Sequence, residues 1–143
     1  MNILFLQGPN LNLLGLQSSK INKDRLTLCK LNRHLKKYLR NTPHKIKIFQ
    51  THKEFQAINY LQRNRNWSDG HLIIPTTWSI NNWTIAETLK ILNIPTVTVF
   101  FNKPYDMGGN KSRSVFKSEN IFSTKGSPIN ASMEGLKKLL EKE

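Results

Sequence analysis

Acidic residues are scarce in this sequence. Nine Asp and Glu residues stand against 22 Lys and Arg among 143 residues, which gives a net charge of +13 at pH 7. A single domain this basic is expected to bind polyanions, with nucleic acid as the usual partner and an anionic membrane surface as the second. The charge therefore favours a polyanion-binding function.

Cysteine and long apolar segments are also lacking. The single cysteine, Cys29, excludes an intramolecular disulfide, and its place in a helical pattern indicates packing rather than a reactive thiol. No apolar run approaches the roughly 20 residues of a membrane-spanning helix. The first residues lead directly into a strand without a basic segment or cleavage site, so we expect no removable targeting segment.

Alanine is rare, with three residues, whereas Lys, Asn and Ile contribute 16, 16 and 13 residues. The three abundant residues have AT-rich codons and alanine has GC-rich ones, so we infer an AT-rich genome such as that of an organelle or a reduced endosymbiont. This composition predicts a protein of an organelle, with the mitochondrial matrix as the first choice, or of the cytoplasm of an endosymbiont.

Short apolar segments alternate with amphipathic ones along the chain. The patterns predict strands at 3–7, 45–51, 71–75, 95–101 and 120–123, and helices at 27–41, 53–65, 80–92 and 132–141. A polar loop is predicted at 102–118. The alternation predicts an α/β fold of the flavodoxin-like, doubly wound form, with a five-stranded parallel sheet and helices on both faces, in a single domain over 1–143. Ligands of such sheets bind beyond the carboxyl ends of the strands.

The first predicted strand ends in the run Gly8-Pro9-Asn10-Leu11-Asn12-Leu13-Leu14-Gly15. This run resembles the N-terminal signature of type II 3-dehydroquinate dehydratases, and the order and length of the elements are similar to that family over the whole chain. The resemblance implies the dehydration of 3-dehydroquinate to 3-dehydroshikimate through an enolate. It implies a tyrosine base activated by an arginine, amide groups that hold a water molecule, and a histidine acid positioned by a glutamate.

The lid of the family's site is altered in this chain. Asn12 stands where the family's loop asparagine stands, but Gln17 occupies the place of the activating arginine and carries no charge. No tyrosine precedes Tyr38, so the family's lid tyrosine is missing. Without that base, we expect no proton abstraction by the family's route.

The strand ends also depart from the family's pattern. Ile74 stands where the family has asparagine, and Thr98 and Phe100 stand where it has the glutamate and histidine of Glu-x-His. We therefore expect no catalytic residues at the family's site positions. The alternative is a relocated base, for which Tyr105 in the loop after the fourth predicted strand is the candidate.

Basic residues are concentrated in the first half of the chain. On the predicted helix 27–41, four of them recur at helical spacing along one stripe, and like charges on one helix face repel each other. A stripe with so few acidic neighbours indicates a polyanion footprint. The candidate RNA-binding residues are Lys20, Lys23, Arg25, Lys30, Arg33, Lys36, Lys37, Arg40, Lys111, Arg113 and Lys117.

The tryptophans and histidines say less about function than the charge does. Trp83 is expected in the core, whereas Trp67 and Trp78 fall in loops, where packing and base stacking both stay open. The four histidines show no metal-binding spacing. We expect no metal and no cofactor.

Together these features favour a pseudoenzyme that serves as a basic, rRNA-contacting subunit of a large ribonucleoprotein, first of all a mitochondrial ribosome. RNA and neighbouring proteins of that assembly would be its partners. The alternative is a divergent but active type II 3-dehydroquinate dehydratase of the shikimate pathway, and the third hypothesis is a protein scaffold in another organellar complex. The resemblance implies a dodecamer, which a recruited subunit is not expected to keep.

Overall fold

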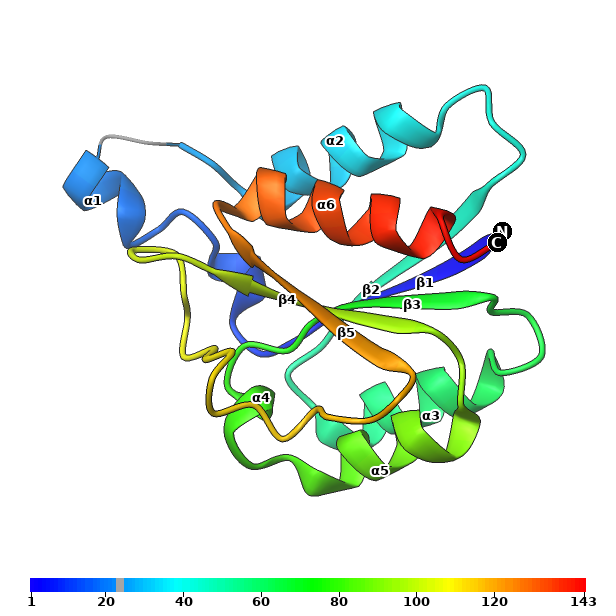
Figure 1. The fold of residues 1–143 in the computed structure, drawn as a ribbon. Helices are drawn as coiled ribbons and strands as arrows, with labels where there is room; N and C mark the ends of the chain where they lie inside the picture. The colour runs from blue at the N-terminus through cyan, green and yellow to red at the C-terminus, as the bar shows by residue number, and fades with distance from the viewer. Residues whose placement is uncertain (23–24) are drawn as a thin grey trace.

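A five-stranded parallel sheet forms the centre of the structure, a computed structural model that describes residues 1–22 and 25–143 (Figure 1). Its strands are β1 (Asn2–Gln7), β2 (Lys45–Gln50), β3 (Gly70–Ile74), β4 (Thr96–Phe101) and β5 (Ile121–Gly126). The strand order is β2-β1-β3-β4-β5, and each neighbouring pair is parallel. The predicted flavodoxin-like, doubly wound fold is confirmed; that the chain forms a single domain stays a prediction.

Helices cover both faces of this sheet. The helical segments are η1 (Leu11–Leu13), α1 (Ser18–Asn22), α2 (Leu28–Leu39), α3 (Glu54–Arg63), α4 (Trp78–Asn81), α5 (Trp83–Leu92) and α6 (Pro128–Leu140). In Figure 1, α2 and α6 lie on one face, and α3 and α5 lie on the other. None of the helices in the described part of the chain is long and apolar enough to cross a membrane.

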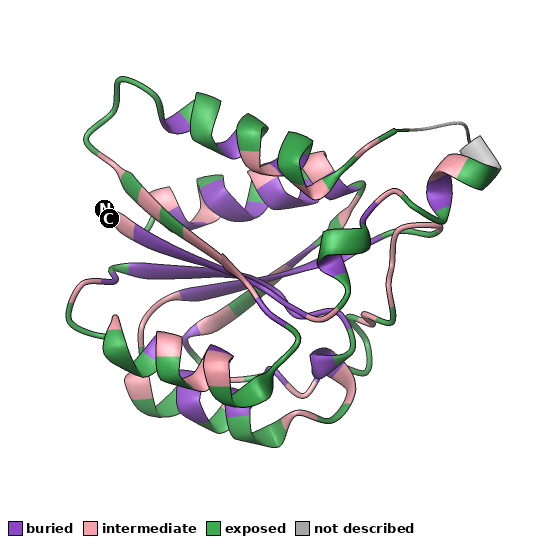
Figure 2. Ribbon diagram, turned by 180° about the vertical axis from the view of Figure 1, so that it is seen from behind, coloured by how far each residue is buried: buried purple, intermediate pink, exposed green. Residues whose placement is uncertain are grey.

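The strand period divides the core into two layers. Alternate residues of β1 point to opposite faces, so Ile3 and Phe5 pack in the layer of α2 and α6, while Leu4 and Leu6 pack in the layer of α3 and α5. Figure 2 shows the central strands buried along their length and the edge strands partly exposed. This burial on both faces is typical of the centre of a parallel sheet.

The predicted helix at 80–92 is two helices. The break falls at Asn82, whose side-chain oxygen accepts a hydrogen bond from the Ile85 amide at 3.0 Å and caps α5. Trp78 lies in the short helix α4 and is buried, so of the two roles left open for it, packing and base stacking, the structure supports packing. Trp83 begins α5 and is 68% exposed, so the prediction that it lies in the core is wrong.

Three smaller expectations also differ from the structure. Cys29 is exposed on α2 rather than packed. Strand β5 continues to Gly126, and α6 begins at Pro128, four residues before the predicted start. Proline favours the first turn of a helix because its missing N–H group has no helical partner there, which explains the early start.

Candidate active site

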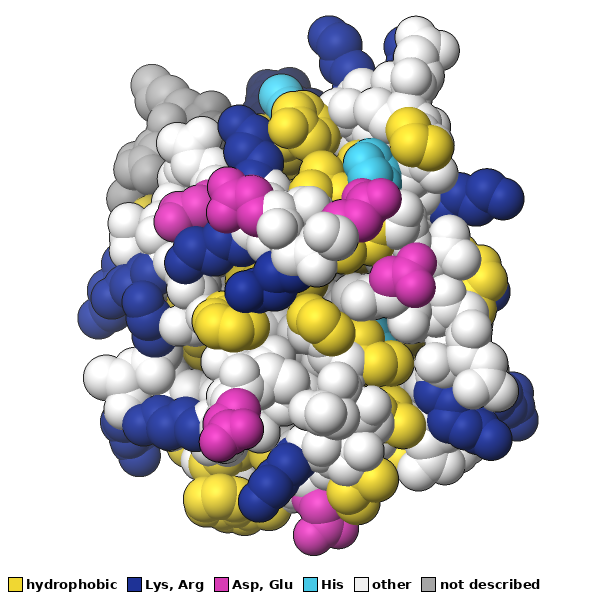
Figure 3. All heavy atoms as spheres, turned by 45° about the vertical axis from the view of Figure 1, so that its right-hand side comes forward, with side chains coloured by type: hydrophobic (Ala, Val, Ile, Leu, Met, Phe, Trp, Pro, Cys, Tyr) yellow, Lys and Arg dark blue, Asp and Glu magenta, His cyan; other side chains and the backbone are white. Residues whose placement is uncertain are grey.

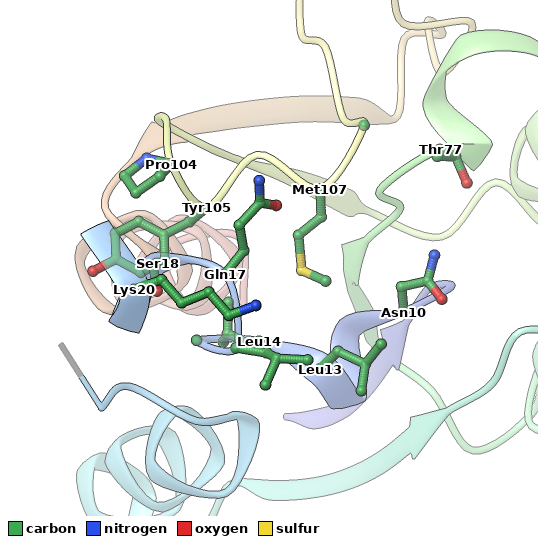
Figure 4. A pocket seen from close by; sticks show the side chains of 13 residues that line it. Asn10, Leu13, Leu14, Gln17, Ser18, Lys20, Thr77, Pro104, Tyr105 and Met107 are labelled. Carbon is green, nitrogen blue, oxygen red and sulfur yellow. The ribbon is translucent and has the colours of Figure 1, made fainter. Parts of the chain in front are cut away.

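A pocket of about 740 Å³ opens beyond the carboxyl ends of the strands, where ligands of doubly wound sheets bind. Its walls come from the loop after β1, from α1, from Thr77 after β3 and from the loop after β4 (Figure 4). The volume falls in the range of about 300 to 1,000 Å³ that is usual for small-molecule sites. The lining residues are Asn10, Leu13, Leu14, Gly15, Leu16, Gln17, Ser18, Lys20, Thr77, Pro104, Tyr105, Met107 and Gly108.

The loop after β1 is held by close backbone contacts. The Gly8 amide donates a hydrogen bond to the Ile74 carbonyl at 2.8 Å, and a Cβ atom at position 8 would lie 2.6 Å from the Pro75 oxygen. Gly15 has a φ of +90°, and a Cβ atom there would lie 1.7 Å from the Leu26 oxygen. Both glycines of the run 8–15 are therefore required by the backbone geometry.

The pocket wall combines apolar and polar groups. Leu13, Leu14 and Met107 supply apolar surface, and Lys20 is the one charged side chain of the lining. In Figure 4 the Lys20 amine extends along the pocket toward Leu14, while the Tyr105 hydroxyl points the other way, toward α1. An apolar hollow with one cation suits a small organic anion.

The five family-site positions are spread over different surroundings. Gln17 lines the pocket, whereas Asn12 is exposed and lines a neighbouring hollow beside Arg25. Ile74 is buried in the core layer of α2 and α6. The structure thus brings one of these three residues to the pocket.

Thr98 and Phe100 lie together at a second, smaller hollow of about 290 Å³ between β4, β5 and the loop before β5. The Thr98 hydroxyl donates a hydrogen bond to the Phe122 carbonyl at 3.3 Å, and Phe100 is 2% exposed. Both side chains are used in packing and sheet contacts. That the five family-site positions take no part in catalysis stays a prediction.

The predicted RNA-binding residues are not gathered in one place. Lys20 lines the large pocket, Lys111 and Lys117 line the smaller hollow, and Lys23 lies outside the described residues. Helix α2 carries a row of exposed basic residues: Lys30, Arg33, Lys36 and Lys37, with Arg40 at its end. Arg25 and Arg113 are exposed in other segments. On the face shown in Figure 3, basic side chains are scattered, with acidic ones between them.

Several residues of the pocket were not predicted from the sequence. Ser18, Thr77 and Met107 line it, yet none belongs to a recognisable motif. Their signal is positional, because each follows one of the strands whose carboxyl ends form the crevice. A search restricted to those loops would have found them.

Perturbed titratable groups lie away from the pocket. Burial lowers the pKa of His71 on β3 to about 4, and burial raises the pKa of Tyr60 on α3. Neither residue lines the pocket. In residues 1–22 and 25–143, no three His, Cys, Asp or Glu side chains are grouped so that they could hold a metal ion.

Comparison with known proteins identifies relatives along nearly the whole chain. The family model described as dehydroquinase class II matches residues 1–139. A 3-dehydroquinate dehydratase of Clostridium botulinum is 31% identical over 114 residues, which are 80% of this chain and 77% of the relative. One of Endomicrobium trichonymphae is 25% identical over 138 residues, 96% of each chain.

Solved structures agree on the fold. A type II dehydroquinase from Butyrivibrio crossotus superposes with a TM-score of 0.83 at 21% identity, covering 98% of this chain and 97% of that chain. A 3-dehydroquinate dehydratase-like protein from Bifidobacterium longum gives a TM-score of 0.67 at 13% identity, covering 100% and 98%.

These findings contradict the expected role as a ribosomal, RNA-contacting pseudoenzyme. The relatives named above are enzymes, and none of them is a ribosomal protein. The expectations of a non-enzyme and of RNA and ribosomal proteins as partners are therefore wrong. The physical reason is that net positive charge attracts anions of every size and does not distinguish RNA from a small carboxylate. An organellar location by itself stays a prediction.

Proposed function

Since this chain belongs to the dehydroquinase class II family, we propose that it is a divergent 3-dehydroquinate dehydratase. The reaction removes water from 3-dehydroquinate and yields 3-dehydroshikimate. The observation that carries the proposal is the pocket itself, because one of its walls is the family's signature loop 8–15. The substrate would bind in this pocket.

The chemistry requires a base near the carbon next to the ketone. Tyr105 is the tyrosine on the pocket wall, whereas Tyr38 and Tyr60 lie on α2 and α3. Its loop follows β4, and its side chain lies beside α1 in Figure 4, so the base would come from a different segment than the lid tyrosine of the resemblance. We assign Tyr105 as the general base that removes this proton, which requires its hydroxyl to turn from α1 into the pocket when the substrate binds.

The enolate and the substrate hydroxyls need hydrogen-bonding partners. The side-chain amides of Asn10 and Gln17 and the hydroxyl of Thr77 line the same pocket. Amide donors near a developing enolate oxygen stabilise its negative charge. These three groups are therefore the partners that the pocket offers to the ring oxygens, directly or through water, and for Gln17 this proposal replaces the expectation that it takes no part in catalysis.

The proposed function is tested with purified protein and 3-dehydroquinate. Product formation is followed by the ultraviolet absorbance of the conjugated ketone and confirmed by NMR. We expect turnover by the native chain and a decrease of about 100-fold or more in kcat for Tyr105→Phe, as for the loss of a general base.

Tyr38→Phe is the matched control, because Tyr38 is 44% exposed on α2 and outside the pocket. It should keep the native rate. Absence of product with the native chain would contradict the function, and equal rates for Tyr105→Phe and the native chain would contradict the assigned base.

A further inference from the structure

The loop after β1 leaves the sheet between two neighbouring strands, because the strand order places β1 between β2 and β3. Backbone hydrogen bonds join the three strands up to their carboxyl ends. There the Thr51 amide donates to the Gln7 carbonyl at 3.0 Å, and the Gly8 amide donates to the Ile74 carbonyl at 2.8 Å. Beyond Gly8, side chains that follow β2 and β3 hold the loop.

The peptide unit between Pro9 and Asn10 is held at both of its polar groups. Its carbonyl oxygen accepts a hydrogen bond from the Thr76 hydroxyl at 2.9 Å, and its N–H group donates to Nδ1 of His52 at 3.0 Å. Thr76 follows β3 and His52 follows β2, so the two bonds come from the two strands that flank β1. Because a trans peptide unit is planar, its C=O and N–H groups point in opposite directions, and partners on both fix the orientation of the plane.

The backbone of Thr76 is strained, with a φ of +47°. A positive φ is rare for a β-branched residue, because its Cβ atom crowds the backbone, and such residues persist where their surroundings require them. Thr76 is 3% exposed and lies against the loop after β4, since a Cβ atom on Gly109 would come within 3.6 Å of the Thr76 Cα. A requirement for the hydroxyl that binds Pro9 explains a threonine at this position.

We propose that Thr76 and His52 are positioning residues that clamp the Pro9–Asn10 peptide unit and thereby fix the Asn10 side chain at the pocket. Asn10 lines the pocket at the start of η1, and its own carbonyl accepts from the Leu13 amide at 2.9 Å (Figure 4). The role in catalysis rests on the proposed function, in which the Asn10 amide is a partner of the enolate. Donors stabilise a developing charge best when they need no reorientation during the reaction.

Hydrogen exchange of the Asn10 amide, detected by NMR, tests the clamp in the free protein. Thr76→Val keeps the shape of the side chain and removes its hydroxyl, so the peptide plane can rotate. We expect the Asn10 amide to exchange at least about tenfold faster in this variant, although its acceptor on His52 is still present. An unchanged exchange rate would overturn the clamp.

Thr124→Val is the matched control. The Thr124 hydroxyl donates to the Ala131 carbonyl at 2.8 Å and Thr124 is 2% exposed, so this substitution removes a hydrogen bond of the same kind and burial. Thr124 lies on β5 and outside the pocket. We expect a similar decrease in Tm for both variants, but native exchange of the Asn10 amide in Thr124→Val. Equally fast exchange in both would attribute the opening to lost stability and overturn the clamp.

Turnover of 3-dehydroquinate tests the positioning role. We expect Thr76→Val and His52→Leu each to lower kcat about tenfold and to change KM less than about threefold, because a partner of the transition state is misplaced. Thr76→Ser restores the hydroxyl, and His52→Asn restores an acceptor near the place of Nδ1, so both should recover most of the native kcat. A native kcat in Thr76→Val and His52→Leu would overturn the positioning role.

The clamp and the proposed function fail in distinguishable ways. A native chain that forms no 3-dehydroshikimate would contradict the proposed function, and the exchange rates of the Asn10 amide would still decide whether the clamp exists. Turnover by the native chain, with the same kcat in Thr76→Val, would retain the function and contradict the positioning role.

Discussion

The loop 8–15 and the carboxyl ends of β3 and β4 lie at the same edge of the sheet but are determined by different forces. Gly8 and Gly15 are required by backbone contacts that leave no room for a side chain. At the strand ends, Ile74 and Phe100 are buried and determined by packing. The conformation of the loop thus requires residues without a side chain, whereas the strand ends require side chains that fill the core.

This difference explains how the chain keeps the family's signature while departing from it at the strand ends. The signature run specifies the shape of a loop, so its retention indicates the fold. The strand ends accept Ile74 and Phe100 because apolar side chains fill a buried position well. The base would then come from the loop after β4, where Tyr105 lines the pocket.

The largest effect should come from the loop. Gly15→Ala would place a Cβ atom 1.7 Å from the Leu26 oxygen at a φ of +90°, so the backbone must shift. We expect a loss of at least about 4 kcal/mol in the free energy of unfolding, measured by urea denaturation. Gly126→Ala is the control, because its Cβ atom would lie 3.7 Å from Ala131 and should change stability by less than about 1 kcal/mol. Equal stability of the two variants would contradict the account of the loop.

The strand-end region is tested by Phe100→Ala. Removing a buried phenyl ring leaves a cavity, and we expect a loss of about 3 to 4 kcal/mol in thermal or urea unfolding. Phe122→Ala on the neighbouring strand removes a ring that is 38% exposed and should lose less than half as much. If Phe100→Ala were as stable as the native chain, packing would not determine this position.

The amino end of β3 contrasts with its carboxyl end, because it buries a titratable group. Burial lowers the pKa of His71 to about 4, while the unfolded chain titrates near the ordinary value of about 6.5. The unfolded state therefore binds more protons between these values, and stability falls as the pH decreases from 6.5 to 4, by about 3 kcal/mol in total.

His71→Leu should remove this contribution and flatten the dependence of the unfolding free energy on pH between 7 and 4. His34→Gln is the control, since His34 is exposed on α2. The same slope for His71→Leu and the native chain would show that His71 is not buried as a neutral ring.

The smallest effect concerns the helix break beyond β3. Asn82→Ala removes the side chain that caps α5 and should cost about 1 kcal/mol in urea denaturation. Asn82→Asp retains a capping oxygen and should keep nearly the native stability. A loss of stability of similar size in both variants would contradict the capping role of the Asn82 side chain.

The spacing of apolar residues was sufficient to predict the fold class, the strands and most of the helices. This is because buried residues recur at different intervals in strands and in helices. It failed at Trp83, since a local cap at Asn82 starts a new helix and turns that residue outward. The predicted fold class gave the position of the crevice, beyond the carboxyl ends of the strands. Within those loops the lining residues could not be singled out, because Lys20 and Tyr105 are far apart in the sequence and come to one pocket only in the fold.

The charge was the least specific of the sequence features. It led to RNA as the expected partner, although the same lysines can bind small anions. In the structure, Lys20 differs from the other predicted RNA-binding residues because it lines the large pocket. Local surroundings, which the sequence does not give, determine what a charge binds.

The most direct test is the rate of 3-dehydroshikimate formation by the native chain and by a variant whose pocket is filled. Leu13 lines the pocket and is 47% exposed, so Leu13→Trp should occupy the pocket without disturbing the core. Phe55→Trp, at a side chain that is 60% exposed on α3, is the control. We predict turnover by the native chain and by Phe55→Trp, and a rate at least about tenfold lower for Leu13→Trp. Equal rates for all three proteins, or no turnover by the native chain, would contradict catalysis in this pocket.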